Sequence, residues 1–407
     1  MTCSVLMVAY YYPPRGGGGV QRTVKFAKYL PEFGIRPVVL TCGGAPRHLR
    51  DTTFLVAQDV VSVPFREPGR IIGRLNEYLR LERISGWARP AIKAALATVH
   101  EQGIEAIYST ASPYTNHVVA RAVARELGLP WIVDFRDLWT TNALYTARTP
   151  WLAKRHRALE DSLYKEANVI LATSPYQKKS IVDTFGVDSA KVRVITNGFD
   201  PADFLEDPTT ANQPPSIVKK NAPVKIGYLG SLYAAYKPDD LILALRFIKR
   251  RWPERMRELS FEFIGDYDRS SNKVLRDPEL QSILKVRSYV PHGELPALRR
   301  SFDGFLLYLP ALGDGIKGMI PQKVFEYLAT RKPIFAIVPP SDVADLLKAH
   351  QAAVLAPAGD PIGIARALLE FVEMMRSDSV PRAQGSLEGF SRKVLTRQLA
   401  DVIEELI

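Results

Sequence analysis

Cysteine is almost absent from this chain, which has only Cys3 and Cys42 among its 407 residues. Two cysteines this far apart match no metal or redox spacing, and they exclude a small scaffold held by several disulfides. Long apolar runs are also missing, since no stretch approaches the roughly 18 residues that would indicate a membrane-spanning helix. The start, "MTCSVLMVAYYYPP", lacks the basic segment and cleavage site of a signal peptide and predicts a buried first strand. We therefore expect a cytoplasmic protein.

Acidic residues are fewer than basic ones, 43 against 54, which gives a formal net charge of +11. Such a balance favours nucleic acid, an anionic membrane surface or phosphate-bearing substrates, or it is only a solvated basic face. No zinc-finger, RNP or basic-zipper pattern is present, so we expect no nucleic-acid partner. Basic residues interleaved with Ile, Leu, Tyr and Trp across 70–100, and "WLAKRHR" at 151–157, instead favour peripheral contact with the inner face of the cell membrane.

Short apolar segments alternate with amphipathic ones along the chain, which predicts an α/β fold built on parallel sheets. The alternation runs through about residue 205, stops in the Pro-, Thr- and Asn-rich stretch 206–221, and restarts at 222. We predict two Rossmann-like domains at 1–205 and 222–383, a linker at 206–221 and a final helix at 384–407. Ligands of open parallel sheets bind beyond the carboxyl ends of the strands, so a ligand cleft is expected where the two halves face each other.

Four consecutive glycines, Gly16, Gly17, Gly18 and Gly19, separate the first predicted strand from a helix that starts near Val20. Glycines at a helix start let an anion touch the exposed backbone N–H groups, because no Cβ is in the way. The stretch fits neither G-x-G-x-x-G nor the P-loop pattern. A flexible turn is the other reading, but a simple turn needs only one glycine.

Charged residues follow one predicted strand of the first half, "PWIVDF", where we place Asp134, Arg136 and Asp137 at the tip. Two carboxylates beside an arginine can bind hydroxyls or transfer protons, or they form an internal ion pair that fixes the loop. Ser174 and Asn197-Gly198 are typical of a helix cap and a turn.

The second half has its own polar strand ends. Gly230-Ser231 close a predicted strand, and Lys237 follows shortly after. Lys323 and Glu326 lie three residues apart at the start of a predicted helix, so they share one helix face. A lysine beside free helix N–H groups suits a diphosphate, and a glutamate next to it suits sugar hydroxyls. A surface ion pair is the competing reading.

The chain resembles the retaining glycosyltransferases of the GT-B fold, in the large group that includes bacterial sugar transferases of family 4. The resemblance rests on the order of six segments: "YYYPPRGGGGVQRT", "STASPYTNHVVARAVARELGLPWIVDFRDLWT", "KVRVITNGFD", "IGYLGSLY", "YVPHGELPALRRSFD" and "PQKVFEYLATRKPIFAIV". It implies two Rossmann-like domains facing across a cleft, with the last helix crossing back onto the first domain.

The resemblance also implies roles for the second half. That half would bind a nucleotide-diphosphate sugar donor, with Lys237 on the diphosphate, Glu326 on the ribose, and the segment around Val290 and His292 on the base. Two residues of the family pattern are missing, since the first glutamate of E-x7-E falls at Gly318 and the usual arginine at Ser231. We hypothesise that Lys323 replaces the lost positive charge.

For the first half, the resemblance places the glycine loop near the donor diphosphate and the acceptor. The family's usual histidine is absent from the "DFRD" tip, so Asp134, Arg136, Asp137 and His117 are the candidates for contact with sugar hydroxyls. The implied reaction moves a sugar onto a hydroxyl acceptor with retention, in polysaccharide, glycolipid or glycoconjugate biosynthesis, and a lipid-linked acceptor is a further hypothesis.

No D-x-D pattern stands at a strand end, so we expect no metal and no other cofactor. Three alternatives stay open at this point. A nucleotide-sugar epimerase shares the architecture, a non-catalytic nucleotide-sugar-binding protein would tolerate the missing glutamate and arginine, and a basic nucleic-acid binder is disfavoured.

Overall fold

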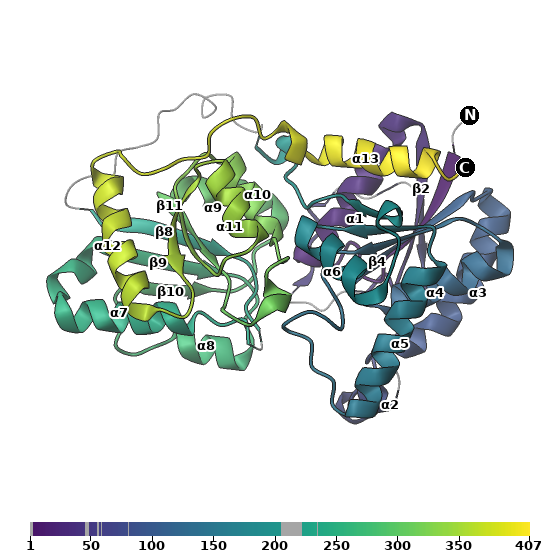
Figure 1. Ribbon diagram of the computed structural model, residues 1–407, viewed down its shortest axis with the longest axis horizontal. Coiled ribbons are helices and arrows are strands. Elements are labelled where there is room, and N and C mark those ends of the chain that lie inside the picture. The colour runs from purple at the N-terminus through teal and green to yellow at the C-terminus, as the bar shows by residue number, and fades with distance from the viewer. Residues whose placement is uncertain are drawn as a thin grey trace. The chain divides into compact units, whose positions relative to one another are not determined.

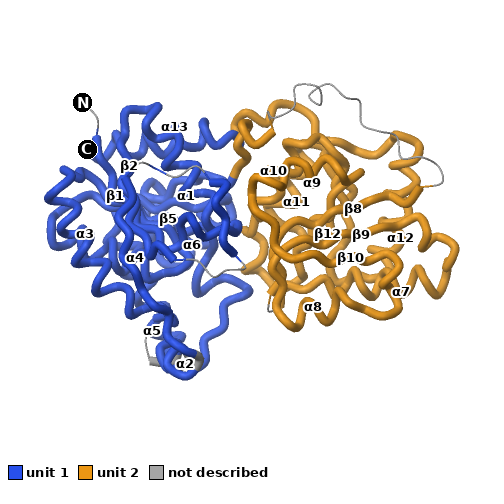
Figure 2. Tube along the Cα trace, turned by 180° about the vertical axis from the view of Figure 1, so that it is seen from behind, with its two compact units in different colours: residues 1–197, 390–407 blue, residues 198–389 orange. Residues whose placement is uncertain are grey.

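The computed structural model describes residues 3–44, 49–54, 57, 59–79, 81–204, 222–233 and 235–407. These residues form two compact units, each with its own parallel sheet (Figure 2). The first unit consists of residues 1–197 together with 390–407, and the second of residues 198–389. The linker predicted at 206–221 lies outside the described residues.

The sheet of the first unit has seven strands in the order β3-β2-β1-β4-β5-β6-β7, all parallel. Its strands are β1 (Cys3–Val8), β2 (Ile35–Thr41), β3 (Asp59–Ser62), β4 (Ala106–Ala111), β5 (Trp131–Phe135), β6 (Val169–Ala172) and β7 (Val192–Val194). Its helices are α1 (Gly18–Tyr29), α2 (Arg70–Leu79), α3 (Ala88–Gln102), α4 (Thr115–Leu127), α5 (Pro150–Glu166), α6 (Pro175–Phe185) and α13 (Arg392–Glu404).

Alternate residues of β1 enter two separate apolar layers, as the period of a strand requires. Leu6 and Val8 pack with α3, α4 and α5, whereas Val5 and Met7 pack with α1 and α13. Both faces of the sheet are covered, which is why these parallel strands are almost continuously apolar. The last helix therefore belongs to the first unit, where it lies beside α1 (Figure 1).

The sheet of the second unit has six strands in the order β10-β9-β8-β11-β12-β13, again all parallel. Its strands are β8 (Val224–Leu229), β9 (Leu259–Ile264), β10 (Leu284–Arg287), β11 (Gly304–Tyr308), β12 (Ile334–Val338) and β13 (Ala353–Pro357). Its helices are α7 (Asp239–Arg251), α8 (Arg269–Leu275), α9 (Leu295–Ser301), α10 (Gln322–Ala329), α11 (Asp342–Ala349) and α12 (Pro361–Arg376).

The two-domain α/β prediction is confirmed, and so is the helix cap predicted at Ser174. Helices α4 and α6 end at Gly128 and Gly186, which both adopt the left-handed conformation expected of a C-terminal glycine. Ser174 caps α6, because its side chain accepts a hydrogen bond from the backbone N–H of Gln177. Strand β3 was not predicted, since its four residues "DVVS" form an edge strand with no continuous apolar run.

Candidate functional site

The glycine loop of the first unit lies where the chain order of the sheet reverses. Strand β1 has β2 on one side and β4 on the other, and the crevice at such a switch point is where open α/β sheets bind ligands. Gly17 has φ 100°, which disfavours any other residue there, and α1 begins at Gly18 without a side-chain cap. Gly18 and Gly19 are exposed. Gly18 and Gly19 therefore lie exposed at the N-terminus of α1, whereas Gly16 is buried and its amide donates to the carbonyl of Leu49 at 2.7 Å. The role of this loop in ligand binding stays a prediction.

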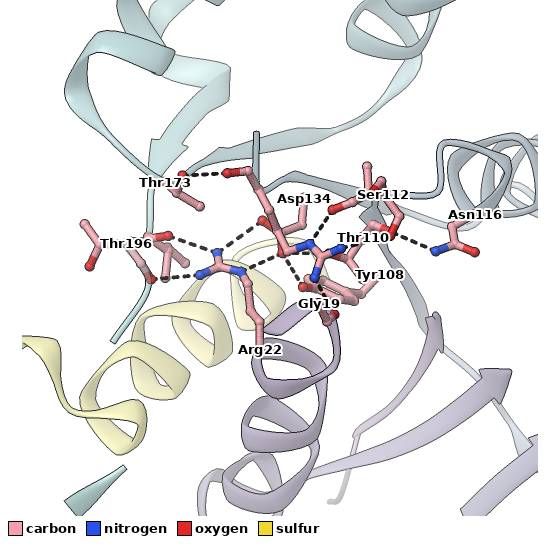
Figure 3. Close-up of polar contacts among 12 residues, drawn as sticks. Gly19, Arg22, Tyr108, Thr110, Ser112, Asn116, Asp134, Thr173 and Thr196 are labelled. Carbon is pink, nitrogen blue, oxygen red and sulfur yellow. Dashed lines mark hydrogen bonds and ion pairs between the residues drawn. The ribbon is translucent and has the colours of Figure 1, made fainter. Parts of the chain in front are cut away.

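Arg136 ties this loop to the end of β4. Its guanidinium donates hydrogen bonds to the backbone carbonyls of Gly19 and Ala111, and to that of Ser112 at 2.9 Å (Figure 3). A Cβ on Gly19 would lie 3.4 Å from Nη1 of Arg136, so a glycine suits this close approach. Arg136 thus fixes the loop and places a positive charge beside the N-terminus of α1.

Asp134 has a structural role instead of the predicted contact with sugar hydroxyls. Strand β5 continues to Phe135, so Asp134 lies within the strand and is fully buried under α1. Its carboxylate accepts hydrogen bonds from Arg22 Nε at 2.7 Å, Tyr108 Oη at 2.5 Å and Thr110 Oγ1 at 3.2 Å (Figure 3). Arg22 also donates to the carbonyls of Ile195 and Thr196. A carboxylate with these partners and no exposed surface joins α1, the sheet and the segment after β7.

His117 is likewise a core residue and does not reach a substrate. It is fully buried on the inner face of α4, with Nδ1 2.8 Å from Oγ of Ser109 and the ring 4.7 Å from that of Phe135. Desolvation lowers its pKa to about 3, so the imidazole is neutral near pH 7. Its other nitrogen, Nε2, has no hydrogen-bond partner among the described residues.

Asp137 is the predicted carboxylate of this loop that stays exposed. No described residue hydrogen-bonds to its side chain. The following loop is held by buried Glu160, which accepts hydrogen bonds from the backbone N–H and the hydroxyl of Thr140. Asp137 therefore combines access to solvent with a fixed backbone.

In the second unit, the structure brings Gly230 and Lys323 together. Gly230 follows β8 with φ 141°, and a Cβ there would lie 2.6 Å from Nζ of Lys323. The ammonium lies 3.6 Å from the ring centroid of Tyr228, and no described residue accepts a hydrogen bond from it. Desolvation lowers the pKa of Lys323 to about 7, although Glu326 partly offsets this. Lys323 is thus a desolvated amine with a lowered pKa, which lies against a glycine loop at the β8–β11 switch point.

Glu326 is held in place by an arginine that the sequence did not single out. Arg299 of α9 donates from Nη2 to Oε2 of Glu326 at 2.6 Å, and both side chains are buried. The Arg299 guanidinium also packs over the ring of Phe204, with 5.0 Å to the centroid. Desolvation opposes ionisation of Glu326, but Arg299 and His292 outweigh it and lower its pKa below the ordinary value.

His292 belongs to the same cluster through a different partner. Its Nε2 lies 2.9 Å from Oδ2 of Asp203, and the side chain is buried. The imidazole is therefore directed at Asp203, so a contact between this segment and a base would come from its backbone or from half-buried Val290. Lys237 is half-buried and Ser231 is exposed. Among the described residues, neither side chain forms a hydrogen bond or an ion pair with Lys323.

Sequence reasoning missed the residues that hold the predicted ones, above all Arg22, Arg299 and Asp203. Arg22 lies 112 positions from its partner Asp134, and Arg299 lies 27 from Glu326. Among the described residues, no three His, Cys, Asp or Glu side chains are grouped to hold a metal ion. The expectation that no metal or cofactor is required stays a prediction.

Comparisons with known proteins found a family match by sequence and similar solved structures. Residues 16–203 match the family model described as Glycosyltransferase Family 4. Residues 16–203 are therefore similar to glycosyltransferase family 4. No curated protein matches the chain by sequence.

Solved structures match the whole chain at low sequence identity. Sucrose-phosphate synthase from Thermosynechococcus elongatus has a TM-score of 0.71 at 11% identity, with 99% of each chain covered. HepE from Anabaena in complex with UDP-glucose has a TM-score of 0.66 at 16% identity, covering 99% of this chain and 100% of that one. WaaG, a glycosyltransferase involved in lipopolysaccharide biosynthesis, has a TM-score of 0.62 at 13% identity, covering 98% and 99%. The similarity to these structures confirms the GT-B fold, and the family match over residues 16–203 agrees with the family-4-like resemblance.

Proposed function

We propose that this protein is a glycosyltransferase, which moves a hexosyl or related sugar from a nucleotide-diphosphate sugar to a hydroxyl acceptor with retention. The proposed setting is bacterial polysaccharide, glycolipid or glycoconjugate biosynthesis. Two observations support a nucleotide-sugar donor: the family 4 match and the similarity to HepE, whose structure contains UDP-glucose.

The observation that carries the proposal is Lys323. Its ammonium lies against the Gly230 loop and the face of Tyr228, with no carboxylate or carbonyl partner among the described residues. A desolvated cation is unfavourable in the empty protein, and a diphosphate supplies the missing negative charge. Glu326 lies three residues after Lys323 on the same helix. Arg299 holds its carboxylate in place and lowers its pKa, so the ionised carboxylate is suited to ribose hydroxyls.

The chemistry requires stabilisation of the departing nucleoside diphosphate as the bond to the sugar breaks. Positioned cations at that point lower the barrier because they need no reorganisation during the reaction, an effect of about 3–4 kcal/mol for one good donor. In the second unit that role falls to Lys323, with Lys237 as the other predicted cation. In the first unit, the exposed amides of Gly18 and Gly19 and the carboxylate of Asp137 are the groups we assign to the acceptor and sugar hydroxyls.

A thermal-shift screen with UDP-, GDP-, dTDP- and ADP-sugars tests this function. We expect one nucleotide class to raise the melting temperature of the wild type, and Lys323→Ala and Glu326→Ala to weaken that shift by about tenfold in ligand concentration or more. Lys348→Ala is the matched control, because Lys348 is an exposed lysine on α11.

Transfer itself is measured by release of the nucleoside diphosphate in the presence of candidate hydroxyl acceptors. Donor binding without release, for every acceptor and for water, would favour the non-catalytic binding protein. Conversion of the donor to an epimeric sugar nucleotide would favour the epimerase.

A further inference from the structure

Helix α2 of the first unit exposes an unusual amount of apolar surface. Ile71, Ile72 and Leu75 are 86%, 59% and 53% exposed. The first two are adjacent, and Leu75 is four residues beyond Ile71, so all three side chains lie on one helix face. Single exposed apolar residues are ordinary on protein surfaces, but three on one short helix form a patch that indicates a binding surface.

The opposite face of α2 is anchored to the protein, which fixes the direction in which the apolar face points. A Cβ on Gly73 would lie 3.0 Å from Nε of Arg83, so the arginine packs directly on the helix backbone. Arg83 also donates to the carbonyl of Pro68 at 2.8 Å, and Asn76 donates to the carbonyl of Arg83 at 3.1 Å. The helix is therefore held on its Gly73 and Asn76 side, and Ile71, Ile72 and Leu75 remain outside.

Trp151 at the start of α5 is a further large apolar side chain that is exposed near α2. Arg148, just before α5, forms an ion pair with Glu77 of α2 at 2.7 Å, and both figures draw the two helices close together (Figures 1 and 2). Trp151 is 55% exposed, and the guanidinium of Arg155 lies 4.7 Å from its ring centroid. We call Ile71, Ile72, Leu75 and Trp151 the apolar apex.

The surroundings of the apolar apex are basic. Lys154 and Arg155 are exposed on α5. The nearby acidic residues are already engaged: Glu77 pairs with Arg148, Glu67 lies 3.7 Å from Arg15, and Glu82 accepts hydrogen bonds from the backbone of Tyr114 and Thr115.

We propose that the apolar apex inserts into the interfacial region of an anionic lipid membrane, with Lys154 and Arg155 on the lipid headgroups. Ile and Leu side chains suit the acyl boundary, tryptophan suits the headgroup level, and lysine and arginine suit an anionic surface. A second copy of the chain fits less well, because it would bring the same positive charges together. Among the described residues no helix is long and apolar enough to span a bilayer, so the proposed contact is interfacial.

This proposal rests on the proposed function in one respect: a protein that binds a membrane can reach a lipid-linked hydroxyl acceptor. Its physical content is independent of that function. Nucleotide-sugar binding is measured without lipid, and vesicle binding is measured without nucleotide, so either result can fail alone.

Vesicle flotation tests the apolar apex directly, using vesicles of phosphatidylcholine alone and of equal parts phosphatidylcholine and phosphatidylglycerol. We expect binding to the anionic vesicles, weakened by salt, and little binding to phosphatidylcholine. The variant with Ile71→Ser, Ile72→Ser and Leu75→Ser should bind at least about tenfold more weakly, because the apolar side chains that enter the interface are gone. Lys154→Glu with Arg155→Glu should also weaken binding by about 25-fold or more, at roughly fivefold for each positive charge removed.

The second unit offers matched controls. Leu243→Ser and Ile362→Ser remove side chains that are 50% and 46% exposed, and Arg250→Glu with Arg251→Glu reverses two exposed neighbours of which Arg251 also lies near a tryptophan ring. These variants should bind anionic vesicles like the wild type. Equal loss in the controls, or undiminished binding by the apex variants, would overturn the proposal.

Two further measurements keep the result clear. Circular dichroism should show that the apex variants stay folded, because the substituted side chains are exposed. Brominated lipid should quench Trp151 but leave Trp87, Trp131 and Trp139, which are buried, so Trp151→Phe should abolish most of the quenching. A wild type that ignores anionic vesicles but dimerises, and whose apex variant is monomeric in size-exclusion chromatography, would show instead that the apex joins two copies.

Discussion

The two units have the same kind of sheet, but the charged side chains at their switch points differ in whether they have partners of opposite charge or hydrogen-bond acceptors. In the first unit, Asp134 and Arg22 satisfy each other inside the core, and Arg136 is satisfied by backbone carbonyls. In the second unit, Glu326 is satisfied by Arg299, but the ammonium of Lys323 is left on an aromatic face with a lowered pKa.

This difference separates charges that hold a fold from charges that await a ligand. A buried charge with several partners stabilises the arrangement around it and loses stability when one partner is removed. A desolvated charge without a partner costs stability in the empty protein and recovers it when a ligand of opposite charge binds. The first unit therefore provides a rigid loop, and the second provides the stronger attraction for an anion.

The largest expected effect comes from breaking the buried pair of the first unit. Arg22→Met leaves Asp134 buried without its main partner, and we expect the free energy of unfolding to fall by about 3–5 kcal/mol. Denaturant unfolding followed by circular dichroism measures this loss. Adding Asp134→Leu should recover part of it, because neither charge then remains.

An exposed pair serves as the control for that experiment. Asp183→Ala removes the partner of Lys179 on the surface of α6 and should leave the unfolding transition in place. If Arg22→Met unfolds at the wild-type denaturant concentration, Arg22 does not hold Asp134 as the structure shows. The first unit would then lack the fully paired buried charge on which the comparison depends.

Asp137 sharpens the comparison within the first unit, because it is exposed while Asp134 is buried. We expect Asp137→Asn to lower kcat by about 100-fold with donor affinity unchanged, which is the usual loss for a group engaged in proton transfer or in contact with the reacting sugar. Steady-state kinetics with the donor found in the screen measures it. Asp183→Asn is the control. Unchanged kinetics in Asp137→Asn would show that Asp137 neither transfers a proton nor contacts the reacting sugar.

A smaller effect is expected from Arg299, which acts through Glu326. Arg299→Met frees the Glu326 carboxylate from its fixed position, and we expect donor affinity to fall about tenfold while kcat changes little. Arg299→Lys should restore part of the affinity, since it keeps one donor. The exposed neighbour Arg300 provides the control variant Arg300→Met. If donor affinity falls equally in Arg299→Met and Arg300→Met, or in neither, the Glu326 carboxylate does not bind the donor as proposed.

Much of the fold was predictable from local pattern. Apolar runs bounded by turn residues located most of the strands, and Gly128 and Gly186 marked two helix ends because a left-handed residue there strongly favours glycine. Lys323 and Glu326 were also found by a local rule, since three residues on a helix place two side chains on one face.

The wrong emphasis on Asp134 and His117 has a physical cause that is visible in hindsight. Asp134 is two residues beyond Ile132 in the same strand, so both side chains enter the layer under α1. His117 precedes Ala120 and Val123 of the inner face of α4 by three and six residues. In both cases the apolar periodicity of the element continues through the polar residue, and this periodicity correctly indicates a buried side chain. The prediction instead took the polar residue as a sign of a ligand site.

Other contacts were beyond any local pattern. Arg22 meets Asp134, Arg299 meets Glu326 and Asp203 meets His292 only because the topology brings distant segments together. A single sequence contains the residue types but not the pairing, so the partners that set the charge of each candidate residue had to come from the structure.

The central claim is that Lys323 is a largely neutral amine above pH 7 that becomes charged when a diphosphate binds. Calorimetric titration of the best nucleoside diphosphate at pH 8, in phosphate and in Tris, counts the protons taken up on binding. Since a pKa of about 7 is raised by the ligand, we predict uptake of close to one proton and an affinity that falls as the pH rises above 7. The variant Lys323→Met should take up none, and Lys348→Met should match the wild type. Equal affinity at pH 7 and pH 9, or proton uptake that persists in Lys323→Met, would contradict the account.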